Sequence, residues 1–153
     1  MAEREPGVRP CGRVLGLDLG QARIGVAISD DARRLAVPIG TVRTGAPQDM
    51  KAIAALVEEH GATEIVVGLP LSLSGREGEA ADHARRFADA LRGFLGLTVH
   101  LQDERLSTVE AGGSLRRGNV TGRARREVID QVAATVILQS WLDARGRDRP
   151  PDP

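Results

Sequence analysis

The chain has 153 residues, enough for one domain with a core, and its 21 basic and 21 acidic residues leave a formal net charge of zero, so total charge does not indicate a nucleic-acid partner. One cysteine excludes an internal disulfide, and without a secretory or long apolar segment we expect a cytoplasmic protein with no membrane partner. Aromatic residues are only 2% of the chain, which argues against base stacking on aromatic side chains.

The two ends of the chain are rich in charge and proline. We expect residues 1–11 to form a flexible arm and residues 146–153 a disordered tail, because such segments cannot build a core. Cys11 falls in the arm and is interpreted as an inert thiol. One domain is expected between them, over residues 12–145.

The first half of the chain predicts a meander of strands followed by a helix. Runs rich in Val, Leu and Ile predict strands over Arg13–Leu19, Arg23–Ser29 and Leu35–Thr44, and their short connections favour antiparallel pairing. Apolar residues at helical spacing predict a helix over Pro47–His60, which Gly61 ends.

The second half predicts alternating strands and helices. The continuous apolar run Glu64–Leu69 is typical of a strand buried on both faces, and Leu97–Leu101 is a fifth strand. The S-x-x-E sequences at Ser74–Glu77 and Ser107–Glu110 have the form of capping boxes that open helices. A long final helix is predicted from about Arg125 to Ala144. This order indicates an α/β fold with a sheet of mixed strand direction.

Three carboxylates lie where a solvated acid is not expected. Asp18 is inside an apolar strand, Glu104 directly follows one, and Asp130 continues the apolar stripe of the final helix. A buried carboxylate must be paired, hydrogen-bonded or bound to a metal, or else it becomes protonated.

Each acid also has an ordinary structural interpretation. Asp18 could cap the turn at Gly20, Glu104 could pair with Arg105, and Asp130 could interact with the helix dipole. If the three converge, they repel one another unless a divalent cation neutralises them, and oxygen ligands alone suit Mg²⁺ or Mn²⁺. Such a cluster can hold two metals about 3.5–4 Å apart, which is suited to phosphodiester hydrolysis. The histidines show no paired spacing and are interpreted as surface or helix-face residues: His60, His83 and His100.

Basic residues are concentrated between two of these acids. The segment Gly112–Arg126 contains no acid, and its arginines could bind nucleic-acid phosphates or form a solvated loop. Arg23 and Arg105 lie beside the acids in the sequence and could contact phosphate or pair with the acids. The arginines of the basic segment are Arg116, Arg117, Arg123, Arg125 and Arg126.

Four motifs in order carry a resemblance to a known family. They are "GLDLGQARIGVAISD", "IVVGLPLSLSG", "QDERLST" and "VIDQVAATVILQSWLD". Together they resemble the YqgF (RuvX) family of Holliday junction resolvase-like proteins and pre-16S rRNA nucleases, over about Gly12–Asp143. The resemblance implies a ribonuclease H-like fold, with a five-stranded mixed sheet of order 3-2-1-4-5 and helices on both faces. One departure is visible at Ser72, where family members often have Asn.

The resemblance also implies a site and an activity. Asp18, Glu104 and Asp130 match the family's catalytic, metal-binding acids, with Mg²⁺ or Mn²⁺ as cofactor. A two-metal nuclease is expected, which hydrolyses structured RNA in the 5′ maturation of precursor 16S rRNA, with the ribosome as a candidate partner. The alternatives are a Holliday junction resolvase acting as a dimer, an RNA-binding assembly factor without catalysis, and an ATPase suggested by G-x-D-x-G. The sequence leaves open monomer or homodimer.

Overall fold

The structure, a computed structural model, describes residues 12–71, 77–104 and 122–147. The predicted arm 1–11, the second capping box and residues 148–153 of the predicted tail lie outside the described residues, whereas residues 146 and 147 of that tail belong to the last helix. None of the helices in these described ranges is long and apolar enough to cross a membrane. Along the chain the elements are β1 (Arg13–Leu19), β2 (Arg23–Ser29), β3 (Ala36–Arg43), α1 (Gln48–His60), β4 (Ala62–Leu69), α2 (Glu79–Leu95), β5 (Thr98–Asp103) and α4 (Gly122–Arg147).

The strands form one sheet in the order β3-β2-β1-β4-β5. β1 pairs antiparallel with β2, and β2 with β3, whereas β4 runs parallel to both β1 and β5. The predicted strand order and the mixed directions are therefore confirmed. Parallel pairing places the carboxyl ends of β1, β4 and β5 at the same end of the sheet.

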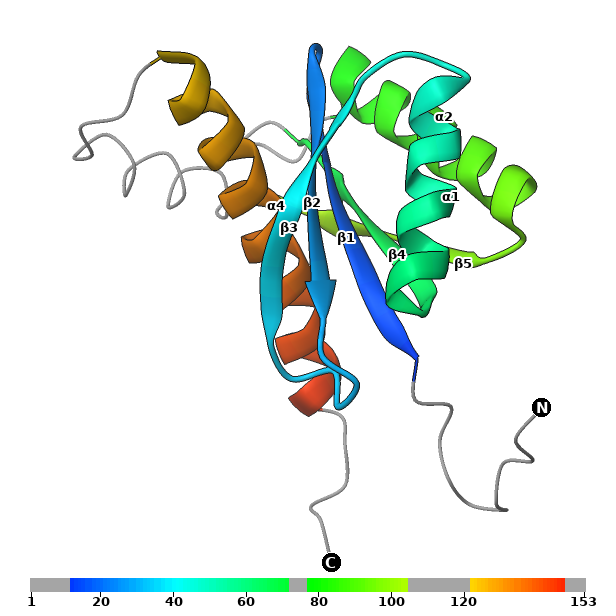
Figure 1. The fold of residues 1–153 in the computed structure, drawn as a ribbon, viewed down its shortest axis with the longest axis vertical. Helices are drawn as coiled ribbons and strands as arrows, with labels where there is room; N and C mark the ends of the chain where they lie inside the picture. The colour runs from blue at the N-terminus through cyan, green and yellow to red at the C-terminus, as the bar shows by residue number, and fades with distance from the viewer. Residues whose placement is uncertain (1–11, 72–76, 105–121, 148–153) are drawn as a thin grey trace, which may run out of the picture.

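Helices cover both faces of the sheet, as expected (Figure 1). α4 packs on one face against β1, β2 and β3, and α1 and α2 cover the other. Side chains of β1 alternate between the two layers. Leu15 and Leu17 join the core beneath α1 and α2, whereas Val14 joins the core beneath α4 with Ala134 and Leu138.

The start of α2 differs from the prediction. This helix begins at Glu79 with Gly78 as its N-cap and no side-chain cap, so the S-x-x-E box ending at Glu77 does not cap it. The reason is local, because Glu77 forms a β-bridge with Leu71 and is held in extended backbone. α4 is also longer than predicted, since it begins at Gly122 and ends at Arg147.

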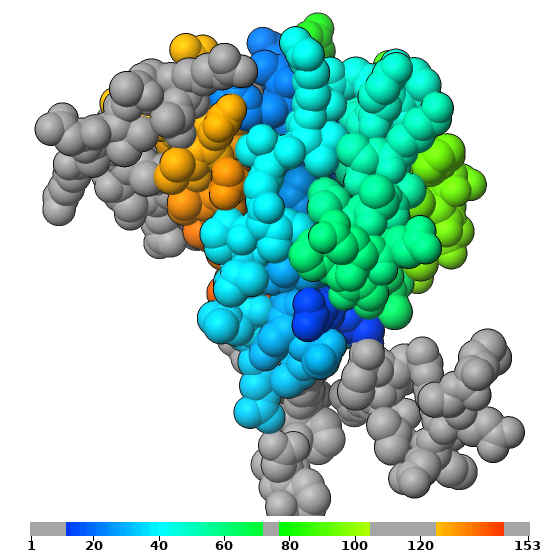
Figure 2. Space-filling view, viewed as in Figure 1, coloured from blue at the N-terminus to red at the C-terminus, as the bar shows by residue number. Residues whose placement is uncertain are grey.

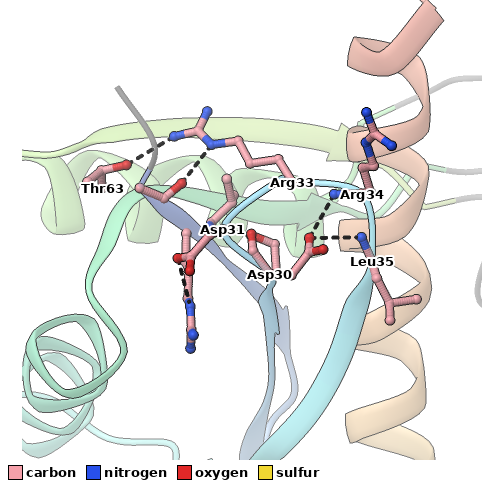
Figure 3. Close-up of polar contacts among 10 residues, drawn as sticks. Asp30, Asp31, Arg33, Arg34, Leu35 and Thr63 are labelled. Carbon is pink, nitrogen blue, oxygen red and sulfur yellow. Dashed lines mark hydrogen bonds and ion pairs between the residues drawn. The ribbon is translucent and has the colours of Figure 1, made fainter. Parts of the chain in front are cut away.

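The β2–β3 turn lies at the opposite end of the sheet from the carboxyl ends of β1, β4 and β5. Asp30 Oδ1 accepts hydrogen bonds from the backbone N–H groups of Arg34 (2.8 Å) and the residue after it (Figure 3). Arg33 has a positive φ of 57°, and from this position it donates to the carbonyl oxygen of Gly12 (2.7 Å) and to Thr63 Oγ1 (3.0 Å). One arginine thus joins the turn to β4 and to the residue that precedes β1.

A polar network continues from Arg33 into the sheet. Arg33 also pairs with Glu64, whose Oε1 lies 2.9 Å from His100 Nε2. The His100 ring lies 4.8 Å from the Trp141 ring of α4, and the guanidinium of Arg145 lies over the same indole at 4.9 Å. The interpretation of His100 as a surface or helix-face residue was therefore wrong, because this residue lies on β5 within a partly buried network.

Candidate functional site

Asp18 lies near the carboxyl end of β1, on the face covered by α4. The period of two puts its side chain on the same face as Val14 and Gly16, and a Cβ at Gly16 would lie 2.7 Å from Leu138 Cβ of α4. Burial of its apolar residues stabilises β1, and the strand holds Asp18 in a partly buried position.

Glu104 reaches Asp18 from the end of β5. Its backbone N–H donates to the carbonyl oxygen of Leu69 (3.3 Å), which continues the β4–β5 pairing by one residue. Its carboxyl group lies over Gly68, where a Cβ would be 2.3 Å from Glu104 Oε2. The two carboxyl groups of Asp18 and Glu104 share a hydrogen bond. A side chain at position 68 would occupy the place of the Glu104 carboxylate.

Asp130 approaches from the opposite direction, on the first half of α4. This helix comes close to β2 at Gly25, where a Cβ would lie only 1.9 Å from the backbone oxygen of Asp130. Gly25 is the direct partner of Asp18 in the β1–β2 register, so the close approach brings Asp130 over Asp18. Arg23 Nη1 lies 3.8 Å from Asp130 Oδ2.

The pKa values of all three acids are raised above their ordinary values. Burial, together with the charges of Glu104 and Asp130, raises the pKa of Asp18 from 3.8 to about 8. Burial also raises the pKa of Glu104, although the hydrogen bond from Asp18 opposes this shift. The pKa of Asp130 is raised by burial against the opposing charge of Arg23. Ionising all three carboxylates together is therefore unfavourable in free energy unless a cation compensates for their charge.

A divalent cation fits the chemistry of these donors. Carboxylate oxygens are the ligands that Mg²⁺ and Mn²⁺ prefer, and a bound cation would remove the repulsion that raises the pKa of Asp18. Within the described ranges, no three Asp, Glu, His or Cys side chains are already close enough to ligate one ion. Asp18 and Glu104 are hydrogen-bonded, whereas Asp130 contacts Arg23.

The predicted phosphate-binding arginines are described only in part. Arg23 begins β2 beside Asp130 and forms the ion pair that the sequence had left as one of two alternatives. Arg125 and Arg126 lie in the first turns of α4, half-buried and exposed respectively, and Arg123 belongs to the same helix. Three further candidates lie outside the described residues, as does Ser72: Arg105, Arg116 and Arg117.

Two glycines that shape the site are absent from the predicted site residues. Gly25 and Gly68 have no side chain, and each leaves room for a group of the site to approach its backbone. Both lie inside strands, where glycine weakens pairing and often marks a close approach of other atoms. That signal could have identified them, but not which groups approach.

The chain is similar in sequence to a known protein family and to named proteins. A family model described as "RuvX: Holliday junction resolvase" matches residues 12–144. A Myxococcus xanthus (strain DK1622) protein named "Putative pre-16S rRNA nuclease" is 52% identical over 141 residues, which cover 92% of this chain and 91% of that protein. A Thermobifida fusca (strain YX) protein of the same name is 54% identical over 145 residues, covering 90% and 91%.

Solved structures agree with the fold. The chain is similar to "T. thermophilus RuvC in complex with Holliday junction substrate", with a TM-score of 0.50 and 14% identity over 88% of this chain and 96% of that one. It is also similar to the fowlpox virus Holliday junction resolvase, with a TM-score of 0.50 and 9% identity over 87% and 99%. At these identities the likeness concerns the fold alone, which is the ribonuclease H-like fold expected from the sequence.

Proposed function

Because the chain belongs to the RuvX family, we propose that it is a divalent-metal-dependent nuclease that hydrolyses phosphodiester bonds in structured RNA. Its substrate is precursor 16S rRNA, and its role is maturation of the 5′ end during ribosome assembly. The names of relatives that are about half identical over nine tenths of the chain support this substrate. The nuclease domain spans residues 12–145.

One observation carries the proposed chemistry. Asp18 of β1, Glu104 after β5 and Asp130 of α4 lie at one end of the sheet, where burial and then the charges of the other two acids raise the pKa of Asp18 to about 8. Clustering three partly buried carboxylates destabilises the folded state. Such clusters are typical of functional sites, where a bound cation compensates for the repulsion. These three residues would hold Mg²⁺ or Mn²⁺, which when bound orients the attacking water and stabilises the leaving oxygen.

The chain's own residues have distinct tasks in this proposal. Asp18 and Glu104 would form a pair of carboxylate ligands for the cation, and the proton that they share in its absence would be released to solvent. Arg23 holds Asp130 near the pair and presents its remaining N–H groups to the substrate phosphate. The arginines at the start of α4 bind the RNA backbone on either side of the cleaved bond.

A second candidate function is cleavage of four-way DNA junctions. The description of the matching family and the RuvC-like fold favour it. A resolvase must cut two symmetric strands, so this function requires a homodimer, whereas cleavage of precursor rRNA does not.

A parallel cleavage assay tests both functions. Wild-type protein and Asp18→Asn are incubated, with Mg²⁺ or Mn²⁺, with a precursor 16S rRNA 5′ fragment and with a four-way DNA junction. Asp82→Asn is the matched control, because Asp82 is an exposed carboxylate of α2. We expect the wild type and Asp82→Asn to cut the RNA, and Asp18→Asn to fall to background.

Each of the other outcomes would exclude part of the proposed function: the RNA substrate, the assigned site or catalysis itself. Symmetric cleavage of the junction alone would replace the RNA substrate with DNA. Full activity of Asp18→Asn would overturn the assignment of the site. If neither substrate is cut but the RNA binds, the protein is an assembly factor without catalysis.

A further inference from the structure

Two arginines lie directly opposite each other on neighbouring strands at the site. Arg23 of β2 is the register partner of Arg43 of β3, and the pairing is antiparallel. Side chains that face each other in this way have Cβ atoms about 4.5–5.5 Å apart, and like charges in such a pair are destabilising. The pair therefore costs stability unless another group compensates for it.

Only one of the two arginines has its charge compensated within the described residues. Arg23 contacts Asp130 of α4 at 3.8 Å. Arg43 is exposed, and its guanidinium makes no hydrogen bond or ion pair with another described residue. The nearest acid along the chain, Asp49, is buried and accepts from the backbone N–H groups of Gly45 (3.2 Å) and Met50 (2.7 Å).

The strand register places Arg43 on the same face of the sheet as Asp18. Asp18 pairs with Gly25, Gly25 pairs with Thr41, and two residues further along the same ladder Arg23 pairs with Arg43. Two strand spacings and two residue steps put the Cα atoms of Asp18 and Arg43 about 12 Å apart. Arg43 is thus at the right distance to contact a phosphate beside one that is held at the acids.

A second element brings unfavourable positive charge to the same place. α4 packs against β2 and β3, and its first turn contains no acidic residue. It carries Arg125 and Arg126 instead, although the positive end of the helix dipole disfavours cations there. Figure 2 shows β3 exposed along the surface with α4 beside it. The end of β3 and the start of α4 therefore both bring arginines to one surface, where the phosphates of a polyanion would neutralise their charge.

We propose that Arg43, together with Arg23, forms a phosphate clamp for the RNA backbone next to the cleaved bond, so that the substrate leaves the site across the end of β3. The inference rests on the proposed function and extends it, because it assigns a binding residue outside the basic segment and a direction for the strand. Arg43 binds the backbone phosphate next to the one at the cleaved bond. Arg23 bridges that neighbouring phosphate and Asp130.

Equilibrium binding tests the clamp separately from cleavage. A short fluorescein-labelled RNA carrying the 5′ leader of precursor 16S rRNA is titrated in EDTA, from about 50 to about 200 mM salt. We expect Arg43→Ala to weaken binding about three- to tenfold and to reduce the salt slope by about 0.7, as loss of one single-strand phosphate contact requires. Arg43→Lys should keep most of the affinity, because a lysine also binds phosphate as a point charge.

The matched control is Arg86→Ala, because Arg86 is 83% exposed on α2, on the opposite face of the sheet. It should bind like the wild type. Thermal melting of the variants separates binding from folding, since removal of Arg43 relieves repulsion and should not lower the melting temperature. Wild-type affinity and salt slope in Arg43→Ala would overturn the clamp and leave the nuclease intact. Failure of the wild type itself to bind or cut RNA would overturn both the clamp and the RNA nuclease.

Discussion

Asp18 is an acid that the protein keeps under electrostatic stress. Its strand is apolar, its nearest polar neighbour is the carboxyl group of Glu104, and a third carboxylate approaches from α4. Burial and like charge both favour the protonated form, which is why the pKa of Asp18 rises to about 8. In the absence of a cation, this residue therefore works against the stability of the folded state.

The first prediction follows from the sign of this shift. Between pH 3.8 and about 8 the native protein holds a proton on Asp18 that the unfolded chain has released, so the free energy of unfolding falls as the pH rises. The slope approaches about 1.4 kcal/mol per pH unit. Asp18→Asn cannot titrate, so in EDTA it should be more stable than the wild type at pH 8, by on the order of a few kcal/mol. Urea unfolding from pH 5 to 8 measures this difference.

The control for this prediction is again the exposed Asp82→Asn, which should follow the wild-type curve. Added Mg²⁺ should stabilise the wild type at pH 8 and leave Asp18→Asn almost unchanged, because only the wild type presents the complete set of carboxylates. Parallel curves for the wild type and Asp18→Asn would show that position 18 carries no such stress.

At the scale of elements, α4 does more than cover the sheet, because it also covers part of an open strand edge. β3 is an edge strand, and the side chain of Gln139 reaches its outer side. Gln139 Oε1 accepts from the N–H of Ala36 (2.8 Å), and its Nε2 donates to the carbonyl oxygen of Arg34 (2.9 Å) and to Asp143 Oδ1 (3.0 Å). One amide thus takes the place of a neighbouring strand at this edge.

The second prediction concerns this amide. Gln139→Ala should lower the free energy of unfolding by about 1 kcal/mol, because two backbone groups lose their partner. The apolar side chains of Leu35 (58% exposed) and Val37 (42% exposed) lie at the same edge. The variant should therefore also self-associate as concentration rises, which sedimentation velocity measures.

Gln48→Ala on α1 is a suitable comparison, since Gln48 is exposed and lies away from the β3 edge. It should remain like the wild type in both stability and association state. Unchanged sedimentation of Gln139→Ala would show that this edge is protected by other means, such as the bulge at Val26/Ala27.

Across the whole molecule, the three acids of the proposed active site and the ion-pair network around Arg33 lie at opposite ends of the sheet. The acids gather where β1 ends, whereas the network of Arg33, Glu64 and His100 joins the turn, β4 and β5 at the other end. Partial burial would raise the pKa of Glu64, but the hydrogen bonds of His100 and Arg33 outweigh burial and lower it. The two ends therefore respond to pH with opposite signs.

The third prediction uses this opposition. Because the pKa of Glu64 is lowered from 4.5, its contribution to stability is present above that value and is lost as the pH falls through the lowered pKa. Glu64→Gln should destabilise the protein by roughly 1 kcal/mol or more at pH 7, with the difference shrinking in acid. Cleavage of RNA should remain near the wild-type level under conditions where the variant is folded.

A matched variant is Glu77→Gln, which breaks the exposed pair with Arg85 and should cost little. Guanidinium unfolding at pH 3 and at pH 7 distinguishes the two carboxylates. A loss of cleavage in folded Glu64→Gln would show that the two ends of the sheet are coupled rather than independent.

Local pattern was enough to predict most elements and the candidate acids. The bounds of β1 and β2 agree with the apolar runs, because a strand is defined by its own alternation and by nearby turns. The capping box failed at α2, because the bridge between Leu71 and Glu77 competes with helix formation and is not visible in a local window. The position of Asp130 on an apolar stripe already indicated that this acid faces the sheet.

What the sequence by itself determined, then, was the α/β class and, through its family resemblance, the order of strands, and it also supplied the three acids as candidates for the site. Tertiary structure alone decided that Asp130 contacts Arg23, that Arg43 lies opposite Arg23, and that Gln139 covers the β3 edge. The physical reason is that periodicity is a property of neighbouring residues, whereas register and close approach depend on residues that are far apart in the chain. Gly25 illustrates the difference, because its role is defined by an atom of α4 about a hundred residues away.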